Sequence, residues 1–468
     1  MSDVGALELT AAYARRYLES LGDREVRATA SVQELRDALG GPLPEHPSAA
    51  EDVIADLIEG GEPGVVSIPS GRYFGFVIGS ALPAALAADW LTSVWDQNAG
   101  LYVGGPSASV VEEVAVGWLA DLLALPSGVS AALVTGCQMA HVTALAAARH
   151  HVLAGVGWDV ARDGLAGSPP IRVLVGEERH VTVDRALRFL GIGSAQLEPV
   201  PADGQGRMRA DALREALASG SGPTIVCAQL GNVNTGAFDP LPAVADAAEE
   251  AGAWLHVDGA FGMWAAASPA LRHLVEGVEL ADSWATDAHK WLNVPYDSGL
   301  AFCRHPEAHR AAMSVHADYL IHAGPDRERD QMDWTPEFSR RARGFAVYAA
   351  LRSLGRSGVA ELVERCCRHA RRFAELLGED EGVEILNDVV LNQVLVRFLD
   401  PDGEHDARTN EIVRRVQADG TCWLSGTRWQ EQAAMRISVS NWRTTAKDVE
   451  RSIEAIRRAA ARLPAEVA

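Results

Sequence analysis

The chain has 468 residues, of which 48% are hydrophobic and 22% charged, and its formal net charge is −21. This composition is ordinary for a globular protein of two or three structural units, and the negative charge argues against nucleic acid and anionic membranes as partners, because both require a positive face. No apolar run reaches the roughly 18 residues of a membrane span, and the N-terminus lacks the basic-then-apolar pattern of a secretory signal, so we expect a cytoplasmic protein.

The first 70 residues look helical and end in a stretch rich in glycine and proline, EGGEPGVVSIPSG. From about residue 130, apolar and β-branched runs alternate with amphipathic segments. The apolar runs cover residues 131–136, 171–177, 224–230, 254–259, 282–287 and 299–303. Such alternation predicts an α/β fold with a largely parallel sheet covered on both faces. We place this large domain at residues 71–340, after an N-terminal helical segment at 1–70.

The pattern changes after residue 340. A long helix is predicted over residues 345–377, and apolar segments follow at 384–399 and 434–440. Further helices are expected over 406–418 and from about residue 446. This order predicts a smaller α+β domain at residues 341–468, and the polar, poorly periodic stretch 315–336 before it is read as a long loop.

The cysteines and lysines narrow the chemistry. Six cysteines are spread along the chain without a CxxC spacing, so we expect reduced thiols and no metal site. Of the 42 basic residues, only Lys290 and Lys447 are lysines, and lysine, unlike arginine, can serve as an amine nucleophile. Lys290 stands among apolar residues, which we expect to lower its pKa; a lysine extending from the surface is the alternative. Lys447 begins the final helix and is expected in solvent.

Two of the predicted strand ends carry suggestive residues. Asp258 closes an apolar run, where an unpaired carboxylate is costly, so it needs a cationic or hydrogen-bonding partner; a turn-capping aspartate is the alternative. Gly136 ends another run, and a helix is predicted to begin near Cys137 and Gln138. Its first N–H groups could bind phosphate oxygens, although a simple tight turn would look the same.

The motif His256-Val257-Asp258-Gly259-Ala260 and the pair His289-Lys290, with the glycine turn upstream, resemble the group II pyridoxal 5'-phosphate (PLP) dependent amino-acid decarboxylases. This family has the aspartate-aminotransferase fold and includes aromatic-amino-acid and glutamate decarboxylases. The likeness extends from residues 72–93 to 434–445. It implies PLP-dependent transferase fold type I with a sheet of the seven-stranded type, and PLP held as a Schiff base on Lys290.

The resemblance also implies individual roles. Asp258 would keep the pyridine nitrogen protonated, and His180 would stack on the ring. The implied cofactor-binding residues are Gly136, Cys137, Gln138, His180, Asn232, Asp258, Ala260, Asp287, His289 and Lys290, and the implied substrate-binding residues are Arg436 for the carboxylate and Phe76 and Tyr102 for the side chain. This chain departs from the family at Cys137 and Gln138, where small residues and serine are usual, at Asp287, often asparagine, and at Asn232, where the family has threonine. Without the resemblance, His180 would be read as a surface histidine and Arg436 as part of a salt bridge.

A further departure bears on the reaction. The family's decarboxylases carry a tyrosine on a mobile loop, and it protonates the substrate carbon after carbon dioxide leaves. The corresponding stretch here, 324–337, has no tyrosine, and Tyr319 lies just before it. His322 or a water molecule would have to donate the proton. Family members without that tyrosine can instead react with oxygen and give aldehydes.

The expected function is PLP-dependent decarboxylation of an L-amino acid, with aromatic or other apolar side chains favoured by the aromatic residues around 73–102. The resemblance implies a homodimer with active sites at the interface. Three alternatives stay open: oxidative decarboxylation and deamination to an aldehyde, a C–C lyase of the sphingosine-phosphate-lyase type, and a PLP-binding regulatory protein. A nicotinamide-binding protein is disfavoured, because no GxGxxG turn follows an early strand.

Overall fold

The computed structural model describes residues 4–315 and 328–461. Within them, the larger sheet has seven strands in the order β1-β7-β6-β5-β4-β2-β3. The strands are β1 (Ser130–Val134), β2 (Arg172–Gly176), β3 (Leu197–Val200), β4 (Thr224–Gln229), β5 (Trp254–Asp258), β6 (Ser283–Asp287) and β7 (Gly299–Cys303). Only β7 runs antiparallel to its neighbours, β1 and β6. The predicted α/β class and the largely parallel sheet are therefore confirmed.

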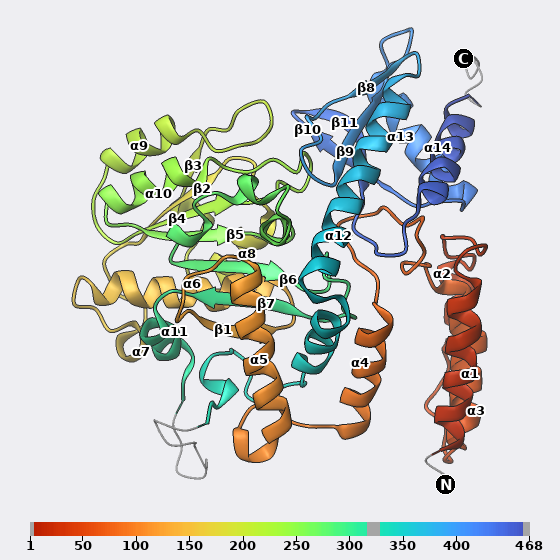
Figure 1. Ribbon diagram of the computed structural model, residues 1–468, viewed down its shortest axis with the longest axis horizontal. Coiled ribbons are helices and arrows are strands. Elements are labelled where there is room, and N and C mark those ends of the chain that lie inside the picture. Colours follow the sequence, from red (N-terminus) through yellow and green to blue (C-terminus); the bar gives the residue numbers. More distant parts are fainter. Residues whose placement is uncertain (1–3, 316–327, 462–468) are drawn as a thin grey trace.

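Helices cover both faces of this sheet (Figure 1). Alternate residues of one strand enter different cores: Leu174 joins the core beneath one set of helices, whereas Val173 and Val175 join the other, as the two-residue period of a strand requires. The covering helices are α5 (Pro106–Leu122), α6 (Cys137–Ala154), α7 (Val160–Asp163), α8 (Val181–Phe189), α9 (Ala210–Ala218), α10 (Leu241–Glu250) and α11 (Pro306–Met313). Strands buried on both sides read as continuous apolar runs, which is why they were visible in the sequence.

The N-terminal segment is helical, as predicted. It contains α1 (Gly5–Ser20), α2 (Val32–Leu39) and α3 (Ala50–Gly61), and α4 (Pro83–Trp95) follows. The start of α2 is fixed by a capping box, in which Ser31 Oγ accepts the N–H of Glu34 at 3.3 Å and Glu34 accepts the N–H of Ser31 at 2.7 Å. Helices α1 and α3 pack on each other at one side of the molecule (Figure 1). None of the residues of α1, α2 and α3 is buried.

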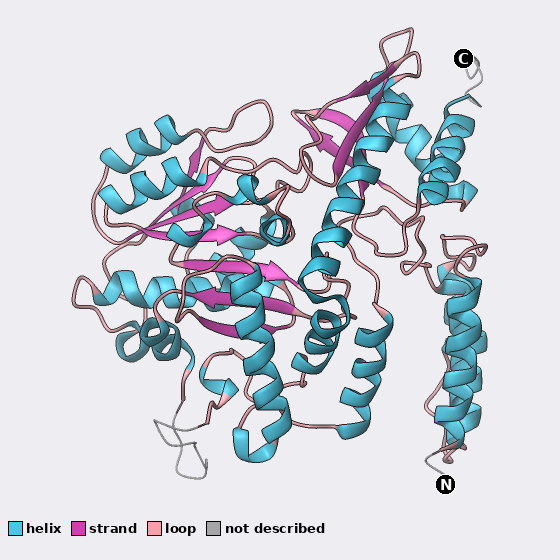
Figure 2. Cartoon of the chain, viewed as in Figure 1, coloured by secondary structure: helices cyan, strands magenta, loops and turns pink. Residues whose placement is uncertain are grey.

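The C-terminal part begins with the long helix α12 (Gly344–Gly378), which bends at Gly355, where φ is +62°. In the described chain its sheet has four antiparallel strands in the order β10-β11-β9-β8 (Figure 2). Its elements are β8 (Val383–Ile385), β9 (Gln393–Phe398), α13 (His405–Asp419), β10 (Ser425–Trp429), β11 (Gln432–Ser438) and α14 (Ala446–Ala461). The short 3-10 helices in the described residues are Glu62–Gly64, Tyr102–Gly104, Ser194–Gln196, Gly262–Ala267, Arg272–Val275, Val278–Leu280 and Gln331–Asp333.

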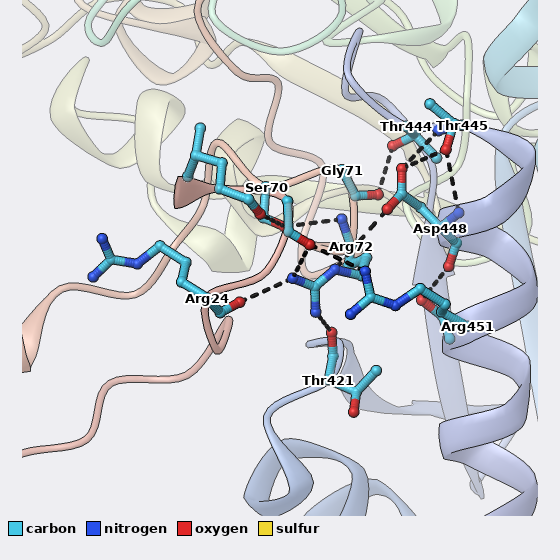
Figure 3. A network of polar contacts seen from close by, with 12 residues as sticks. Arg24, Ser70, Gly71, Arg72, Thr421, Thr444, Thr445, Asp448 and Arg451 are labelled. Carbon is cyan, nitrogen blue, oxygen red and sulfur yellow. Dashed lines mark hydrogen bonds and ion pairs between the residues drawn. The ribbon is translucent and has the colours of Figure 1, made fainter. Parts of the chain in front are cut away.

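Arg72 ties the N-terminal segment to the C-terminal part (Figure 3). Its side chain is buried, and the guanidinium donates to the main-chain carbonyls of Gly22 at 3.1 Å, of Arg24 at 2.9 Å and of Thr421. Its Nε lies 3.9 Å from the Asp448 carboxylate, and burial lowers the pKa of the Arg72 guanidinium. Contacts therefore cross the predicted boundary at residue 70, and the three domain ranges stay a prediction.

The six cysteines all lie in the described part of the chain, where each is buried and forms no disulfide. No helix in residues 4–315 and 328–461 has both the length and the apolar character needed to cross a membrane.

Candidate active site

A cavity of about 270 Å³ opens where β4 and β5 end, beside the turn that follows β6. In largely parallel sheets this edge is where ligands bind. The lining residues are Phe76, Val77, Ile78, His180, Gln229, Gly231, Val233, Asp258, Ala260, Phe261, Lys290, Tyr296 and Arg436. The cavity thus brings together six of the residues proposed from the sequence: Phe76, His180, Asp258, Ala260, Lys290 and Arg436.

Lys290 lies in the turn after β6, and its Nζ is 3.0 Å from Asp287 Oδ2. Burial is the largest single influence and lowers the pKa of this ammonium, but Asp287, Cys137 and Asp258 together outweigh it and raise the pKa above its ordinary value. The prediction of a lowered pKa is therefore wrong. The error has a local cause. The apolar neighbours of Lys290 were visible in the sequence, but the ion pair with Asp287, which precedes it by three residues, was not.

Asp258 ends β5 and is only 4% exposed. Its Oδ1 accepts the N–H of Ala260 at 3.1 Å, and its Oδ2 lies 3.5 Å from His141 Nε2. Burial acts to raise the pKa of this carboxyl, but His141, His180 and Lys290 together bring it well below its usual range. The expected need for a partner is confirmed, and the partner is His141. A buried carboxylate that stays ionised suits a protonated pyridine nitrogen.

Behind Asp258 a chain of polar side chains runs into the core. His141 Nδ1 is 2.9 Å from His256 Nε2, and His256 Nδ1 is 2.9 Å from Ser283 Oγ. Ser283 Oγ also accepts the indole N–H of Trp254 at 2.8 Å. Burial, and then His141, lower the pKa of His256 to about 3, so its ring is neutral.

Cys137 lies against the same two groups. Its Sγ is 3.4 Å from His141 Nε2 and 3.9 Å from Asp258 Oδ1, and burial raises its pKa. In the described residues, Cys137, His141 and Asp258 form the one group of potential metal ligands whose atoms all lie within 4.8 Å of one another. Binding a metal there would replace the contacts that these three side chains make with each other.

The N-terminus of α6 forms the other end of the site. The N–H of Cys137 donates to Asp287 Oδ1 at 2.6 Å, and His289 Nε2 is 3.5 Å from the same oxygen. A Cβ on residue 136 would lie 3.1 Å from His289 Cε1, so Gly136 keeps this turn close to the histidine. Gln138 donates to the carbonyl of Thr182 at 3.3 Å, while its buried Oε1 has no hydrogen-bond partner among the described residues.

His180 caps the start of α8, where its Nδ1 is 2.8 Å from Thr182 Oγ1. Burial lowers the pKa of its ring. Arg436 is buried as well; it donates to Asn234 Oδ1 at 3.4 Å, but its Nε has no partner in the described residues. A guanidinium with an unused N–H in a cavity wall suits a ligand carboxylate. The stacking and carboxylate-binding roles stay predictions.

Seven of the thirteen proposed residues do not line this cavity. Five of them, Gly136, Cys137, Gln138, Asp287 and His289, surround the N-terminus of α6, and Asn232 and Tyr102 remain. The Asn232 amide is engaged in its own loop: it donates to the carbonyl of Glu178 at 3.0 Å and to Gln229 Oε1 at 3.1 Å. Tyr102 begins a 3-10 helix, and its main-chain N–H donates to Asp330 Oδ1 at 2.8 Å. Their roles stay predictions, and for Tyr102 the resemblance places the relevant pocket in a second subunit. Tyr319, His322 and residues 324–327 lie outside the described residues.

Among the polar residues of the site, His141, Gln229 and Tyr296 escaped the sequence analysis. Gln229 is the last residue of β4, and strand ends are the positions at which it could have been sought. Tyr296 stacks on His289, with ring centroids 4.2 Å apart. Desolvation and the nearby Asp287 raise the pKa of its hydroxyl to about 12, so it stays protonated at neutral pH. Its position shortly after Lys290 in the sequence is the feature from which its place in the site could have been predicted.

The donor set fits PLP. The site offers a lysine amine, a buried anionic Asp258 for the ring nitrogen, and a helix N-terminus with a glycine turn. Together, the fold and the site define a PLP-dependent enzyme of fold type I.

Comparison with known families is consistent with that class. The conserved-domain model of the pyridoxal-dependent decarboxylases matches residues 33–399. The chain belongs to this family, and is thus a PLP-dependent enzyme. It is 28% identical to the aromatic-L-amino-acid decarboxylase of Sus scrofa, over 96% of this chain and 94% of the relative. It is 27% identical to the 4-hydroxyphenylacetaldehyde synthase of Rhodiola rosea, over 90% of this chain and 87% of the relative.

Solved structures agree on the fold. The crystal structure of Oryza sativa TDC with PLP and tryptamine aligns with a TM-score of 0.91 at 24% identity and covers 97% of both chains. Mouse CSAD aligns with a TM-score of 0.90 at 22% identity, over 98% of this chain and 99% of that one. The relatives by sequence include both a decarboxylase and an aldehyde synthase.

Proposed function

We propose that the protein decarboxylates an L-amino acid with an aromatic or other apolar side chain, using PLP bound covalently to Lys290. The observation that carries this proposal is the composition of the cavity: Lys290, Asp258 and Arg436 share it with a largely apolar wall. That wall is formed by Phe76, Val77, Ile78, Val233 and Phe261. An acidic substrate side chain would lose its hydration there without gaining a partner.

Each residue has a distinct task in this proposal. Arg436 binds the substrate carboxylate through its free N–H, and Asp258 holds a proton on the ring nitrogen. His180 packs on the ring face, and Lys290 must give up its proton and its ion pair with Asp287 before its amine can react. When bound, PLP supplies the electron sink for the pair of electrons left at the α-carbon. The apolar wall excludes water from that carbon.

A second candidate is oxidative decarboxylation and deamination to an aldehyde. It is favoured by the sequence between Tyr319 and Tyr348, which contains no tyrosine, and by relatives named as aldehyde synthases. The two candidates differ in products. Decarboxylation yields an amine and carbon dioxide, whereas the oxidative reaction also releases carbon dioxide but consumes oxygen and water and yields the aldehyde, ammonia and hydrogen peroxide.

The chain offers a matched pair of lysines for the test. Lys290→Ala should abolish the visible absorption band of the lysine-bound cofactor and reduce turnover of L-tryptophan, L-tyrosine or L-phenylalanine at least roughly a thousandfold, since the amine is lost. Lys447→Ala, at an exposed position, should leave both unchanged. Carbon dioxide, amine, oxygen and ammonia are measured together. Turnover by Lys290→Ala at the parent rate would overturn the proposal, and cleavage without carbon dioxide would mark a C–C lyase.

We also propose a homodimer in which a second copy completes the active site. The apolar side chains that α1, α2 and α3 leave exposed support it, because apolar side chains gathered on a surface often mark a contact with a partner.

A further inference from the structure

Strand β5 carries Trp254, His256 and Asp258 at alternate positions. Alternate residues of a strand face the same side, so these three side chains form a row that leads from the core to the active site. Helix α6 supplies His141 against this row, and β6 supplies Ser283, which is the register partner of His256. The row and its two neighbours form the polar chain behind Asp258, and all five residues are buried.

The donors and acceptors in this chain fix where the protons lie. The Trp254 indole can only donate, so Ser283 Oγ accepts from it at 2.8 Å. The hydroxyl proton of Ser283 is then free to point at His256 Nδ1, 2.9 Å away. His256, neutral, carries its proton on Nε2 and donates to His141 Nδ1 at 2.9 Å. His141 is left with a proton on Nε2, which faces Asp258 Oδ2 at 3.5 Å.

The opposite direction of donation, from His141 toward Ser283, is unfavourable at both ends of the chain. His256 and Trp254 would both donate to Ser283 Oγ, whose hydroxyl proton would have no side-chain partner among the described residues. At the other end, a lone pair of His141 Nε2 would face the carboxylate of Asp258, and two electron-rich atoms would meet. The chain therefore donates in one direction, from Trp254 toward Asp258, and every member is satisfied.

We propose that His141 is a positioning residue for the cofactor: oriented by His256 and Ser283, it donates toward Asp258 and thereby keeps the proton shared by Asp258 and the PLP ring on the ring nitrogen. A donor beside a carboxylate stabilises its ionised form. Asp258 then binds the ring as an anion, which preserves the electron sink that the reaction needs. The proposal rests on the PLP-binding role of Asp258 in the proposed function.

Other titratable groups surround this pair. Cys137 lies on α6 beside His141 Nε2, and it is a weak donor to Asp258. His180, at the start of α8, and Lys290, after β6, act on Asp258 from the cavity side. His180 and Lys290 favour the ionised carboxylate too, but both line the cavity that a ligand would fill. His141 acts from the core, so its contribution persists when a ligand fills the cavity.

The test reads the ring nitrogen directly. PLP labelled with ¹⁵N in the ring is bound to the parent protein and to His141→Leu and His141→Gln, and its NMR shift is followed against pH. The leucine variant removes the donor, whereas the glutamine variant places an amide N–H near the position of Nε2. We expect a protonated ring nitrogen in the parent and the glutamine variant, a partly deprotonated one in the leucine variant, and a dissociation constant for PLP that rises roughly tenfold in the leucine variant alone.

His309→Leu is the matched control. His309 is also a buried histidine, but it contacts Ser130 and Trp334, which do not line the cavity, so the ring-nitrogen signal should stay at the parent value. Ser283→Ala is a milder second variant, and it should shift the ring nitrogen in the same direction as the leucine variant by freeing the proton on His256. If the leucine variant does not fold, this variant decides.

An unchanged ring-nitrogen signal in both His141→Leu and Ser283→Ala would overturn the inference. Since these measurements use the holoenzyme without substrate, failure of the proposed decarboxylation would leave them unaffected. Conversely, a parent protein that bound PLP with an unprotonated ring nitrogen would contradict the inference, whatever reaction it catalyses.

Discussion

Asp287 binds two groups that PLP is proposed to need, the amine of Lys290 and the main-chain N–H of Cys137. Its Oδ2 pairs with Lys290 Nζ at 3.0 Å, and its Oδ1 accepts the N–H of Cys137 at the start of α6, at 2.6 Å. A phosphate at this helix N-terminus would meet the like charge of the carboxylate. The aspartate, at a position where the resembling decarboxylases often have asparagine, therefore opposes cofactor binding twice, by repulsion and by keeping Lys290 protonated.

We predict that Asp287→Asn binds PLP faster and more tightly. The ion pair that raises the pKa of Lys290 is lost while burial still lowers it, so a larger fraction of the amine is neutral at any given pH. The rate at which the visible band appears after mixing with PLP should rise with pH in both proteins, with the rise displaced to lower pH in the variant. At neutral pH the rate should increase roughly tenfold for each unit by which the pKa falls. Asp163→Asn is the control, because Asp163 pairs with Arg162 at the surface, and its rate should equal that of the parent. A parent rate for Asp287→Asn would contradict the prediction that the Asp287–Lys290 ion pair slows cofactor binding.

Single residues differ in how well the sequence revealed them. Asp258 was found because it ends an apolar run, and the carboxyl ends of parallel strands gather at one edge of a sheet. Lys290 was found because it is one of only two lysines and stands among apolar residues. His141 was missed because it lies inside a helix, and its partner His256 is 115 positions away in the sequence. Such a contact depends on how α6 crosses the sheet, and no local pattern encodes it.

Elements were predicted best where burial imposes a simple pattern. The runs that became β4, β5 and β7 matched the strands closely, because strands buried on both faces are continuously apolar. Strand β3 was missed: it lies at the sheet edge, has the sequence LEPV and contains a proline. Strand β10, with the sequence SGTRW, is also an edge strand and is partly exposed. The antiparallel direction of β7 depends on its connection, which composition does not report.

Helix α5 is anchored to the large sheet by a buried ion pair. Arg340 binds Glu112 with both guanidinium nitrogens, at 2.7 and 3.1 Å, and also donates to the carbonyls of Ala99 and Leu133. The side chains are 0% and 2% exposed. The pair thus joins α5, the segment before it and β1.

We predict that Glu112→Ala destabilises the protein by about 3–5 kcal/mol, because it leaves the Arg340 charge buried and uncompensated. Asp121→Ala is the matched control on the same helix: Asp121 pairs with Arg356 in solvent, and its loss should change the free energy of unfolding by no more than about 0.5 kcal/mol. Urea unfolding followed by circular dichroism measures both. Equal changes in the free energy of unfolding would show that the buried pair stabilises the protein no more than the exposed pair does.

The N-terminal helices expose apolar side chains that the fold of one described chain does not explain. Helices α1 and α3 pack mainly on each other, and apolar side chains such as Leu7, Val53 and Leu57 are more than half exposed. A cavity of about 460 Å³ lies between this pair and the active site, with Tyr13 and Tyr17 of α1 on one side and His289 and Tyr296 on the other. A segment of a second copy, placed against α1 and α3, would cover apolar surface and reach the wall of the active site.

We predict a homodimer that depends on these helices. Replacing both Leu7 and Leu57 with glutamate places charges where apolar side chains would meet a partner, so the dissociation constant of the dimer should rise by at least roughly tenfold. Sedimentation velocity across a concentration series measures it, and turnover per chain should fall in parallel with the dimer fraction if each site needs the second copy. Val156→Glu, at a similarly exposed apolar position just after α6, is the control and should sediment as the parent does. A parent protein that remained monomeric, or a double variant that kept its dimer, would show that these helices have another role. A monomer with full activity would show that one chain forms a complete site.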